Sequence, residues 1–315
     1  MAVDKLQIEA KKGYFYTALS SDAKPTPSST FWGTRYPSYL IETDTGDTYK
    51  YQGSGIGWVR IEAKGKPFPV DTLLDTPAGN IDGYSAVNKF GASSNVADGT
   101  EEEVWDGAVA YTWPTSASIT HVRSAVDSAT TQGMVIEVQG VDTNYDLTVQ
   151  NATLDGTNST TEVALTTALR RVFRIKVLDA NAADQDIWAG PTGFATQQAI
   201  VQAGNNQTLM AIYTVPNNKT AYITKYYGTI IGEAGPPAVL PDYVLFKLWN
   251  RDNANGYAAQ LKHQVGVASA GTSIIEHEFK PYVKVTEKTD IYMAALPDGD
   301  DAYVSAGFDM ILVDD

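Results

Sequence analysis

Alternating apolar and polar positions predict β-strands along most of this chain of 315 residues. Residues 134–140 and 172–178 are the strongest examples, because both are rich in β-branched side chains. Residues 163–171 fit either a strand or a short helix. Further strands are predicted at 39–43, 48–51, 58–61, 104–106, 145–154, 161–166, 209–216, 220–227, 243–249, 273–279, 290–295 and 304–313.

Turn-forming residues divide these strands into segments. Residues 1–66 are predicted to form a small N-terminal β-hairpin module with an anchoring role, and the Gly- and Pro-rich residues 67–98 an irregular linker. Two β-sandwich domains are expected at 99–192 and 193–315, where short strands recur with turns between them. The predicted fold is all-β: a small N-terminal β-meander followed by two jelly-roll-like β-sandwiches.

Composition narrows the function classes. A hydrophobic content of 43% excludes a mostly disordered chain, and the lack of cysteine excludes disulfides, thiolate metal sites and a cysteine nucleophile. The net charge of -14 argues against nucleic acid or an anionic membrane surface as a partner. The N-terminal residues carry charges where a secretory signal needs an apolar run, so we expect assembly in the cytoplasm of the producing cell.

The charge is unevenly distributed. Residues 1–66 contain nine Lys/Arg and seven Asp/Glu, a net of +2, whereas residues 67–315 contain fourteen and thirty, a net of -16. One interpretation is a soluble, self-repelling surface on the larger part. The other is that the N-terminal segment docks on an acidic partner while the remainder faces solvent.

Aromatic side chains gather in the segment that has the smallest capacity for a core. Three short strands bury little and normally need another chain or domain to cover their aromatic face. These aromatics either form a small core of their own or pack against another subunit. The candidate contact residues are Trp32, Tyr49, Tyr51 and Trp58.

Motifs for catalysis or cofactor binding are not found in the sequence. His121, His263 and His277 have no partner at metal-ligand spacing and are interpreted as ordinary surface or half-buried histidines, although a Ser-His-Asp site assembled from distant residues stays open. The sequence has no G-x-S-x-G elbow, no P-loop and no G-x-G-x-x-G fingerprint. We therefore predict no enzyme activity, no cofactor and no resident metal.

Two acidic turns resemble cation sites. Residues 142–146 begin like a calcium loop, but Leu147 and Thr153 stand where that loop needs Gly and Glu, so a polar turn is favoured. Asp298, Asp300 and Asp301 form a second acidic turn, which either holds a hard cation or is a solvated hairpin tip.

One basic cluster stands out in the acidic part of the chain. The cluster either grips an acidic partner or a phosphate, or Arg174 and Lys176 share one face of a strand and point to solvent. Its members are Arg170, Arg171, Arg174 and Lys176.

Several of these runs resemble structural proteins of tailed-bacteriophage virions. The hairpin sequence at 42–51, followed by 57–59, resembles a module that is frequent in phage fibre and virion proteins. The C-terminal and middle parts are similar to domains of phage virion proteins, and the resemblance spans roughly residues 40–315. The runs that carry it are 104–107, 140–156, 206–216, 219–224, 278–282, 287–291 and 304–309.

The resemblance implies a non-enzymatic structural component of a virion, assembled in the host cytoplasm. The expected role is capsid decoration, head fibre or neck protein, attached through the N-terminal module to major capsid, neck or tail proteins as a homo-oligomer, a trimer or larger ring. The alternative is a tail fibre or receptor-binding protein whose sandwich binds carbohydrate. A tail-spike depolymerase is a third class, disfavoured because long β-helix repeats are absent.

Overall fold

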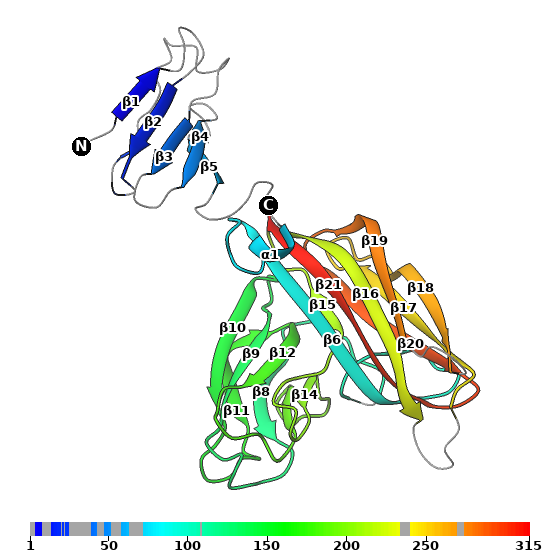
Figure 1. Ribbon diagram of the computed structural model, residues 1–315. Coiled ribbons are helices and arrows are strands. Elements are labelled where there is room, and N and C mark those ends of the chain that lie inside the picture. Colours follow the sequence, from blue (N-terminus) through cyan, green and yellow to red (C-terminus); the bar gives the residue numbers. More distant parts are fainter. Residues whose placement is uncertain are drawn as a thin grey trace. The chain divides into compact units, whose positions relative to one another are not determined.

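The computed structural model confirms an all-β protein (Figure 1). It describes residues 4–7, 14–19, 21, 23–24, 39–42, 47–51, 58–62, 72–107, 109–233, 240–269 and 274–315. In these ranges a single four-residue helix, α1 (Thr72–Asp75), accompanies the strands. The chain divides into two compact units, Met1–Asn80 and Ile81–Asp315.

The first unit is one five-stranded sheet in the order β1-β2-β3-β4-β5. The three predicted strands are present, and two further strands precede them. Strands β3, β4 and β5 form the expected meander, and the additional strand β2 pairs in parallel with β3. The strands are β1 (Asp4–Gln7), β2 (Tyr14–Ala18), β3 (Tyr39–Glu42), β4 (Thr48–Tyr51) and β5 (Trp58–Glu62).

The described residues of the first unit include one small apolar cluster. Tyr16 and Leu40 are buried, and the edge of the Tyr16 ring meets Trp58 with 5.7 Å between ring centroids. Alternation along β3 also turns Glu42 inward, where its carboxylate is met by Lys24 Nζ at 2.8 Å.

Two large sheets in the second unit form the C-terminal sandwich. One sheet has the order β19-β16-β21-β6, and the other has the order β15-β20-β17-β18. The short strand β7 pairs with β20 along the same edge as β15. Aromatic side chains fill the space between the sheets, with Tyr226, Phe246 and Phe308 fully buried. The strands are β6 (Tyr84–Val96), β7 (Glu102–Glu103), β15 (Ile212–Thr214), β16 (Lys219–Glu233), β17 (Tyr243–Asp252), β18 (Gln260–Ala268), β19 (Ile274–Val285), β20 (Thr289–Asp298) and β21 (Ala302–Asp314).

Strand β6 corrects the predicted linker. Residues 84–96 were expected to be irregular, yet they pair with the whole length of β21 in this sandwich. The Gly91 turn signal misleads because Gly91 lies inside the strand, where a Cβ atom would come within 2.4 Å of the Val104 carbonyl oxygen and the Ala211 nitrogen. Glycine is required there by the close approach of neighbouring backbone, with no turn at this position.

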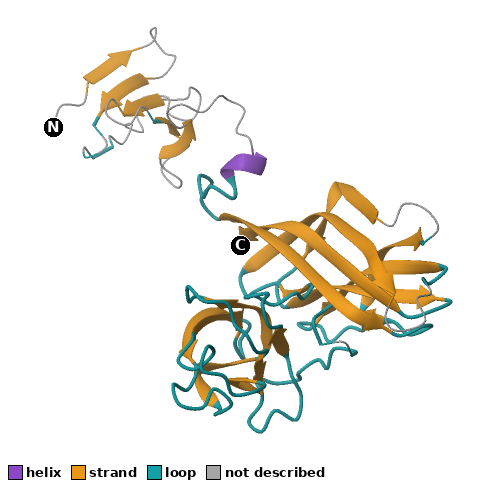
Figure 2. Ribbon diagram, turned by 60° about the horizontal axis from the view of Figure 1, so that its bottom comes forward, coloured by secondary structure: helices purple, strands orange, loops and turns teal. Residues whose placement is uncertain are grey.

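The other sandwich is inserted between β7 and β15. Its sheets have the orders β10-β9-β12 and β11-β8-β13-β14, and Figure 2 shows its strands curling around a common interior. The expected boundaries at 99 and 193 are therefore wrong: β7 belongs to the C-terminal sandwich, and β14 to the inserted one. The strands are β8 (Ile119–Ser124), β9 (Val135–Val141), β10 (Leu147–Thr153), β11 (Val163–Leu169), β12 (Arg171–Val177), β13 (Ile187–Gly190) and β14 (Ala199–Val201).

The two sandwiches share buried apolar surface. Met210, Ile212 and Tyr292, from the C-terminal sandwich side, pack into the same cluster as the core of the inserted sandwich. Conversely, Phe173 of the inserted sandwich lies against Tyr213, with 4.5 Å between ring centroids. This shared core joins the two sandwiches into one unit. The alternative of a short helix at 163–171 is wrong, since β11 occupies that segment.

Candidate functional site

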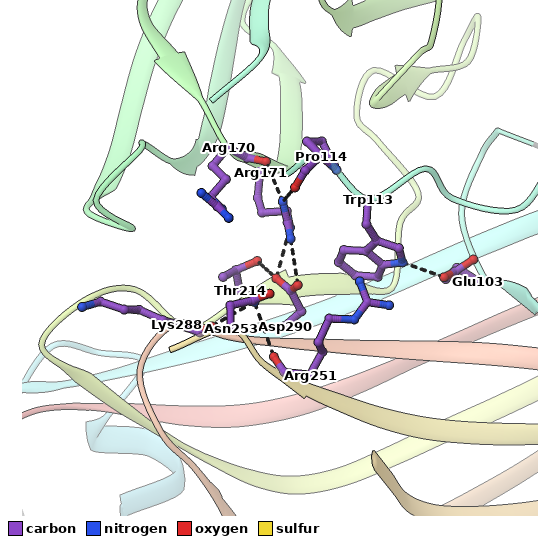
Figure 3. Close-up of polar contacts among 10 residues, drawn as sticks. All are labelled: Glu103, Trp113, Pro114, Arg170, Arg171, Thr214, Arg251, Asn253, Lys288 and Asp290. Carbon is purple, nitrogen blue, oxygen red and sulfur yellow. Dashed lines mark hydrogen bonds and ion pairs between the residues drawn. The ribbon is translucent and has the colours of Figure 1, made fainter. Parts of the chain in front are cut away.

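The most elaborate polar site of the second unit lies where the two sandwiches meet (Figure 3). Arg171, the first residue of β12, donates two hydrogen bonds to the carboxylate of Asp290 on β20. The Nε–Oδ1 distance is 3.1 Å and the Nη2–Oδ2 distance 2.9 Å. Only 2% of Arg171 and 0% of Asp290 is exposed. This is a bidentate ion pair in a dry environment, the geometry in which such pairs are strongest.

The surrounding groups complete the hydrogen bonding of this ion pair. Thr214 Oγ1 donates to Asp290 Oδ1 at 2.7 Å, and Arg171 Nη1 donates to the carbonyl oxygens of Pro114 at 2.5 Å and Arg170 at 3.0 Å. Burial alone would lower the pKa of Arg171, but the Asp290 carboxylate more than offsets burial, and the pKa lies above the ordinary arginine value. The Arg171 guanidinium therefore stays charged inside the protein.

An aromatic ring between two guanidinium groups flanks the ion pair. Arg171 lies 5.2 Å from the centre of the Trp113 ring, and Arg251 lies 4.5 Å from it. The indole Nε1 of Trp113 donates to Glu103 Oε1 at 2.8 Å, which fixes the ring. Because Arg251 belongs to β17 and Arg171 to β12, the stack ties the two sandwiches together.

The predicted basic cluster is resolved differently for each of its members. Arg171 is buried, so the interpretation of the cluster as a patch that grips an external partner is wrong for that residue. Arg174 donates to the carbonyl oxygen of Asn88 at 2.8 Å, and Lys176 pairs with Glu137 at 2.7 Å. The remaining member, Arg170, lies 4.9 Å from the ring of Tyr145. The cluster holds the protein together internally.

Lys89 adds a second buried cation to this junction. Its Nζ donates to the carbonyl oxygen of Phe173, and only 2% of the residue is exposed. Burial, followed by repulsion from Arg174, holds the pKa of Lys89 well below its usual range. The contact joins β6 of the C-terminal sandwich to β12 of the inserted one.

Three of the four aromatic candidates of the N-terminal module are described, and two of them, Tyr49 and Trp58, pack against its buried residues Tyr16 and Leu40. Tyr51 is buried, with its ring centroid 5.3 Å from that of Trp58, while Tyr49 and Trp58 keep part of their surface exposed. Lys24 Nζ lies 4.3 Å from the centre of the Tyr49 ring. Trp32 lies outside the described residues. The described side chains thus form an apolar cluster inside the module, and Tyr49 and Trp58 also keep surface that a partner can contact.

Two of the three histidines, far apart in the sequence, lie together. The rings of His263 on β18 and His277 on β19 stack with 4.0 Å between centroids, and His263 Nδ1 lies 2.6 Å from the Tyr226 hydroxyl. The pair bridges the edges of the two sheets of the C-terminal sandwich. Burial, and then the charge of His277, lowers the pKa of His263. His121 lies elsewhere, beside Thr120 and Thr192.

The acidic turns are closed by their own hydrogen bonds. Asp142 Oδ1 accepts the backbone N–H groups of Asn144 at 2.7 Å and Asp146 at 3.0 Å, as a polar turn does. In the second turn Asp301 Oδ1 accepts the N–H of Asp98 at 2.8 Å. Among the residues that the structure describes, no three His, Asp or Glu side chains are placed to share a metal ion.

The C-terminal sandwich also contains a polar hollow of about 210 Å³, at the end where β17 turns into β18. Asn250 lines it from the inner face of β17, and Tyr257 lines it from the loop that follows. Neither this hollow nor the buried Asp290 was predicted from the sequence. The available signal was the same for both: a polar side chain in a run of otherwise apolar inward positions.

Comparisons with known proteins do not identify the chain. No protein-family model matches it, and searches of curated proteins and of solved structures give no match either. In the described part of the chain, no helix has the length and apolar character that crossing a membrane requires.

Proposed function

We propose that this chain is a structural component of a tailed-bacteriophage virion, attached through its N-terminal module. The observation that carries the proposal is the structural difference between the two units. Among the described residues of the first, Tyr16 and Leu40 form a buried cluster, and Tyr49 and Trp58 pack against it and stay partly exposed. The second is a large body whose two sandwiches are fixed to one another by a buried ion pair. A rigid body on a small separate module suits display on a larger assembly.

The charge distribution supports the same function. Residues 1–80 contain nine Lys/Arg and nine Asp/Glu, a net of zero, so the whole charge of -14 belongs to residues 81–315, with fourteen and twenty-eight. A neutral module docks without the repulsion that keeps acidic bodies apart. We propose a capsid-decoration, head-fibre or neck position, with a homo-oligomer of three or more copies, in which repetition compensates for a small contact per copy.

Deletion of residues 1–66 tests the attachment. A phage that lacks the gene is complemented with the full chain, with the truncated chain, or with the full chain carrying Lys280→Gln, a surface control in the second unit. Purified particles are then assayed by mass spectrometry. Full chain and control are expected in the particles, whereas the truncated chain should stay in the soluble fraction. Incorporation of the truncated chain at the full-length level would overturn the proposal.

A second candidate function is binding of carbohydrate by the C-terminal sandwich, as in a receptor-binding fibre. One observation favours it: the polar hollow beside the exposed Tyr257.

A further inference from the structure

The hollow at the end of the C-terminal sandwich has the character of a small-molecule site. It is lined from β17 by Asn250 and Asp252, from β18 by Gln260 and Lys262, and from β19 by Lys284, with Tyr257 on the intervening loop. Its volume of about 210 Å³ is smaller than the ~300 Å³ at which pockets for drug-sized ligands begin. The hollow therefore suits one ring of a small polar molecule.

Asn250 lines the hollow and carries a side-chain acceptor that the described protein does not use. The residue occupies an inward position on β17, on the same face as Phe246 and Leu248, and only 6% of it is exposed. Its side-chain Oδ1 is buried and has no hydrogen-bond partner in the described structure. A buried acceptor without a donor is costly, and native proteins rarely keep one without a reason. A hydroxyl or N–H group of a ligand would satisfy it.

The two lysines of the hollow differ from every other cation of the acidic unit. Residues 81–315 contain fourteen Lys and Arg. Twelve of them contact a carboxylate, an aromatic ring or a main-chain carbonyl group. Within the described residues, Lys262 Nζ reaches only the amide oxygen of Gln260, at 3.0 Å, and Lys284 has no polar partner.

The nearby carboxylate of Asp252 forms no ion pair with either lysine in the described structure. Asp252 accepts the backbone N–H of Asn255 at 3.0 Å and its side-chain amide at 2.7 Å, so both of its oxygens serve the loop. In a unit with a net charge of -14, two cations without acidic partners at one hollow favour an anionic ligand. Lys262 and Lys284 stand on the edge strands of the two opposing sheets, so they reach the hollow from both sides.

Tyr257 gives the hollow an apolar wall. The residue is 57% exposed, although its backbone N–H is fixed by the carbonyl oxygen of Asp252 at 3.0 Å. An exposed ring held at the rim of a polar hollow offers a flat face for the C–H side of a sugar ring, while amides and lysines hold its polar edge. We infer that the hollow binds an acidic saccharide, a sugar ring carrying a carboxylate, whose hydroxyl group donates to Asn250 and whose carboxylate lies between Lys262 and Lys284.

The test measures binding of sodium glucuronate to the full chain by calorimetry and by NMR of labelled protein. Glucose serves as the ring without the charge, and acetate as the charge without the ring. Lys284→Gln and Tyr257→Ala are expected to weaken glucuronate binding roughly tenfold or more, the loss of one charge-assisted or stacking contact. Matched controls are Lys280→Gln, a lysine of the same strand, and Tyr243→Ala, a partly exposed tyrosine away from the hollow; both should bind as the unaltered chain does.

The inference is supported if glucuronate binds more tightly than both glucose and acetate and the two hollow variants lose that preference. It is overturned if the full chain does not bind glucuronate at tens of millimolar, or if acetate or inorganic phosphate binds as tightly as glucuronate. It is also overturned if the Lys280→Gln and Tyr243→Ala controls weaken glucuronate binding as much as the hollow variants do. Thermal melting of each variant checks that the fold is intact. The result is independent of the proposed attachment through residues 1–66, because incorporation into particles is measured separately and the hollow variants are expected to incorporate normally.

Discussion

Removing one partner of the buried Arg171–Asp290 pair should destabilise the second unit strongly. Replacing Arg171 with Met leaves the Asp290 carboxylate buried with Thr214 as its one recorded hydrogen-bond donor, and replacing Asp290 with Leu leaves the guanidinium without its counter-charge. Breaking a buried pair from one side costs about 3–5 kcal/mol, because an uncompensated charge stays inside. With a urea dependence of about 3 kcal/mol per molar, the unfolding midpoint should fall by about 1 M or more.

The double variant distinguishes a strong interaction from a mere packing defect. Arg171→Met combined with Asp290→Leu removes both charges together, so it should cost clearly less than the sum of the single changes, with a coupling of about 2 kcal/mol or more. The control is the surface pair Lys280–Glu278, whose side chains are 81% and 57% exposed. Its removal should cost under about 1 kcal/mol.

Urea unfolding followed by tryptophan fluorescence measures these differences, and calorimetry shows whether the sandwiches unfold together. We expect one transition for the second unit of the unaltered chain and separated transitions in the Arg171→Met variant. The reasoning is refuted if either single change costs as little as removal of the surface pair. It is also refuted if the two changes are simply additive.

Three further predictions concern titration and packing. Since the pKa of His263 is lowered from its ordinary 6.5, the folded state favours the neutral ring, and stability should fall as the pH drops below about 6.5; His277→Gln should reduce that fall in acid melts. Burial raises the pKa of Asp106 to about 7, although the hydrogen bond from the Leu209 N–H acts in the opposite direction. The neutral form is therefore favoured in the folded state, and stability should decline as the pH rises from 3.8 to 7. In urea unfolding, Asp106→Asn should increase stability by up to about 4 kcal/mol at pH 8 and by almost nothing at pH 3.5. Gly91→Ala should cost about 1–3 kcal/mol in the same assay because the new Cβ meets backbone atoms, whereas Gly156→Ala, with open space around it, should be nearly neutral.

Strand periodicity in the sequence predicts most of the fold, because inward and outward positions alternate wherever a sheet has one buried face. It fails at β6, where a glycine needed for close packing resembles a turn signal. It also fails for the domain boundaries, since an inserted sandwich leaves no mark on local periodicity. Which sandwich β7 and β14 join is decided by pairing partners far away in the chain.

The junction was harder to predict than the fold. Arg171 and Arg174 belong to one basic cluster in the sequence. Strict alternation along the strand would place Arg174 on the same face as Val172 and Arg171 on the opposite face. The register shift between Val172 and Arg174 breaks that alternation, so that Arg171, Val172 and Phe173 are all buried in succession. A bulge of this kind has no clear local signature, and the partner, Asp290, lies 119 residues away.

The pairing of β6 with β21 has a mechanical consequence. Strand β6 is the first strand of the second unit, and its beginning pairs with the end of β21, where the Asp314 N–H donates to the Gly83 carbonyl oxygen at 2.8 Å. Figure 1 shows the C-terminus beside this end of β6. Tension applied along β6 from the preceding residues would load the ladder from Tyr84–Val313 to Val96–Ala302 in shear, with its hydrogen bonds sharing the force. The inserted sandwich, connected through β7 and β15, lies outside that line of force and would keep its shape while the load is borne by a single long strand pair.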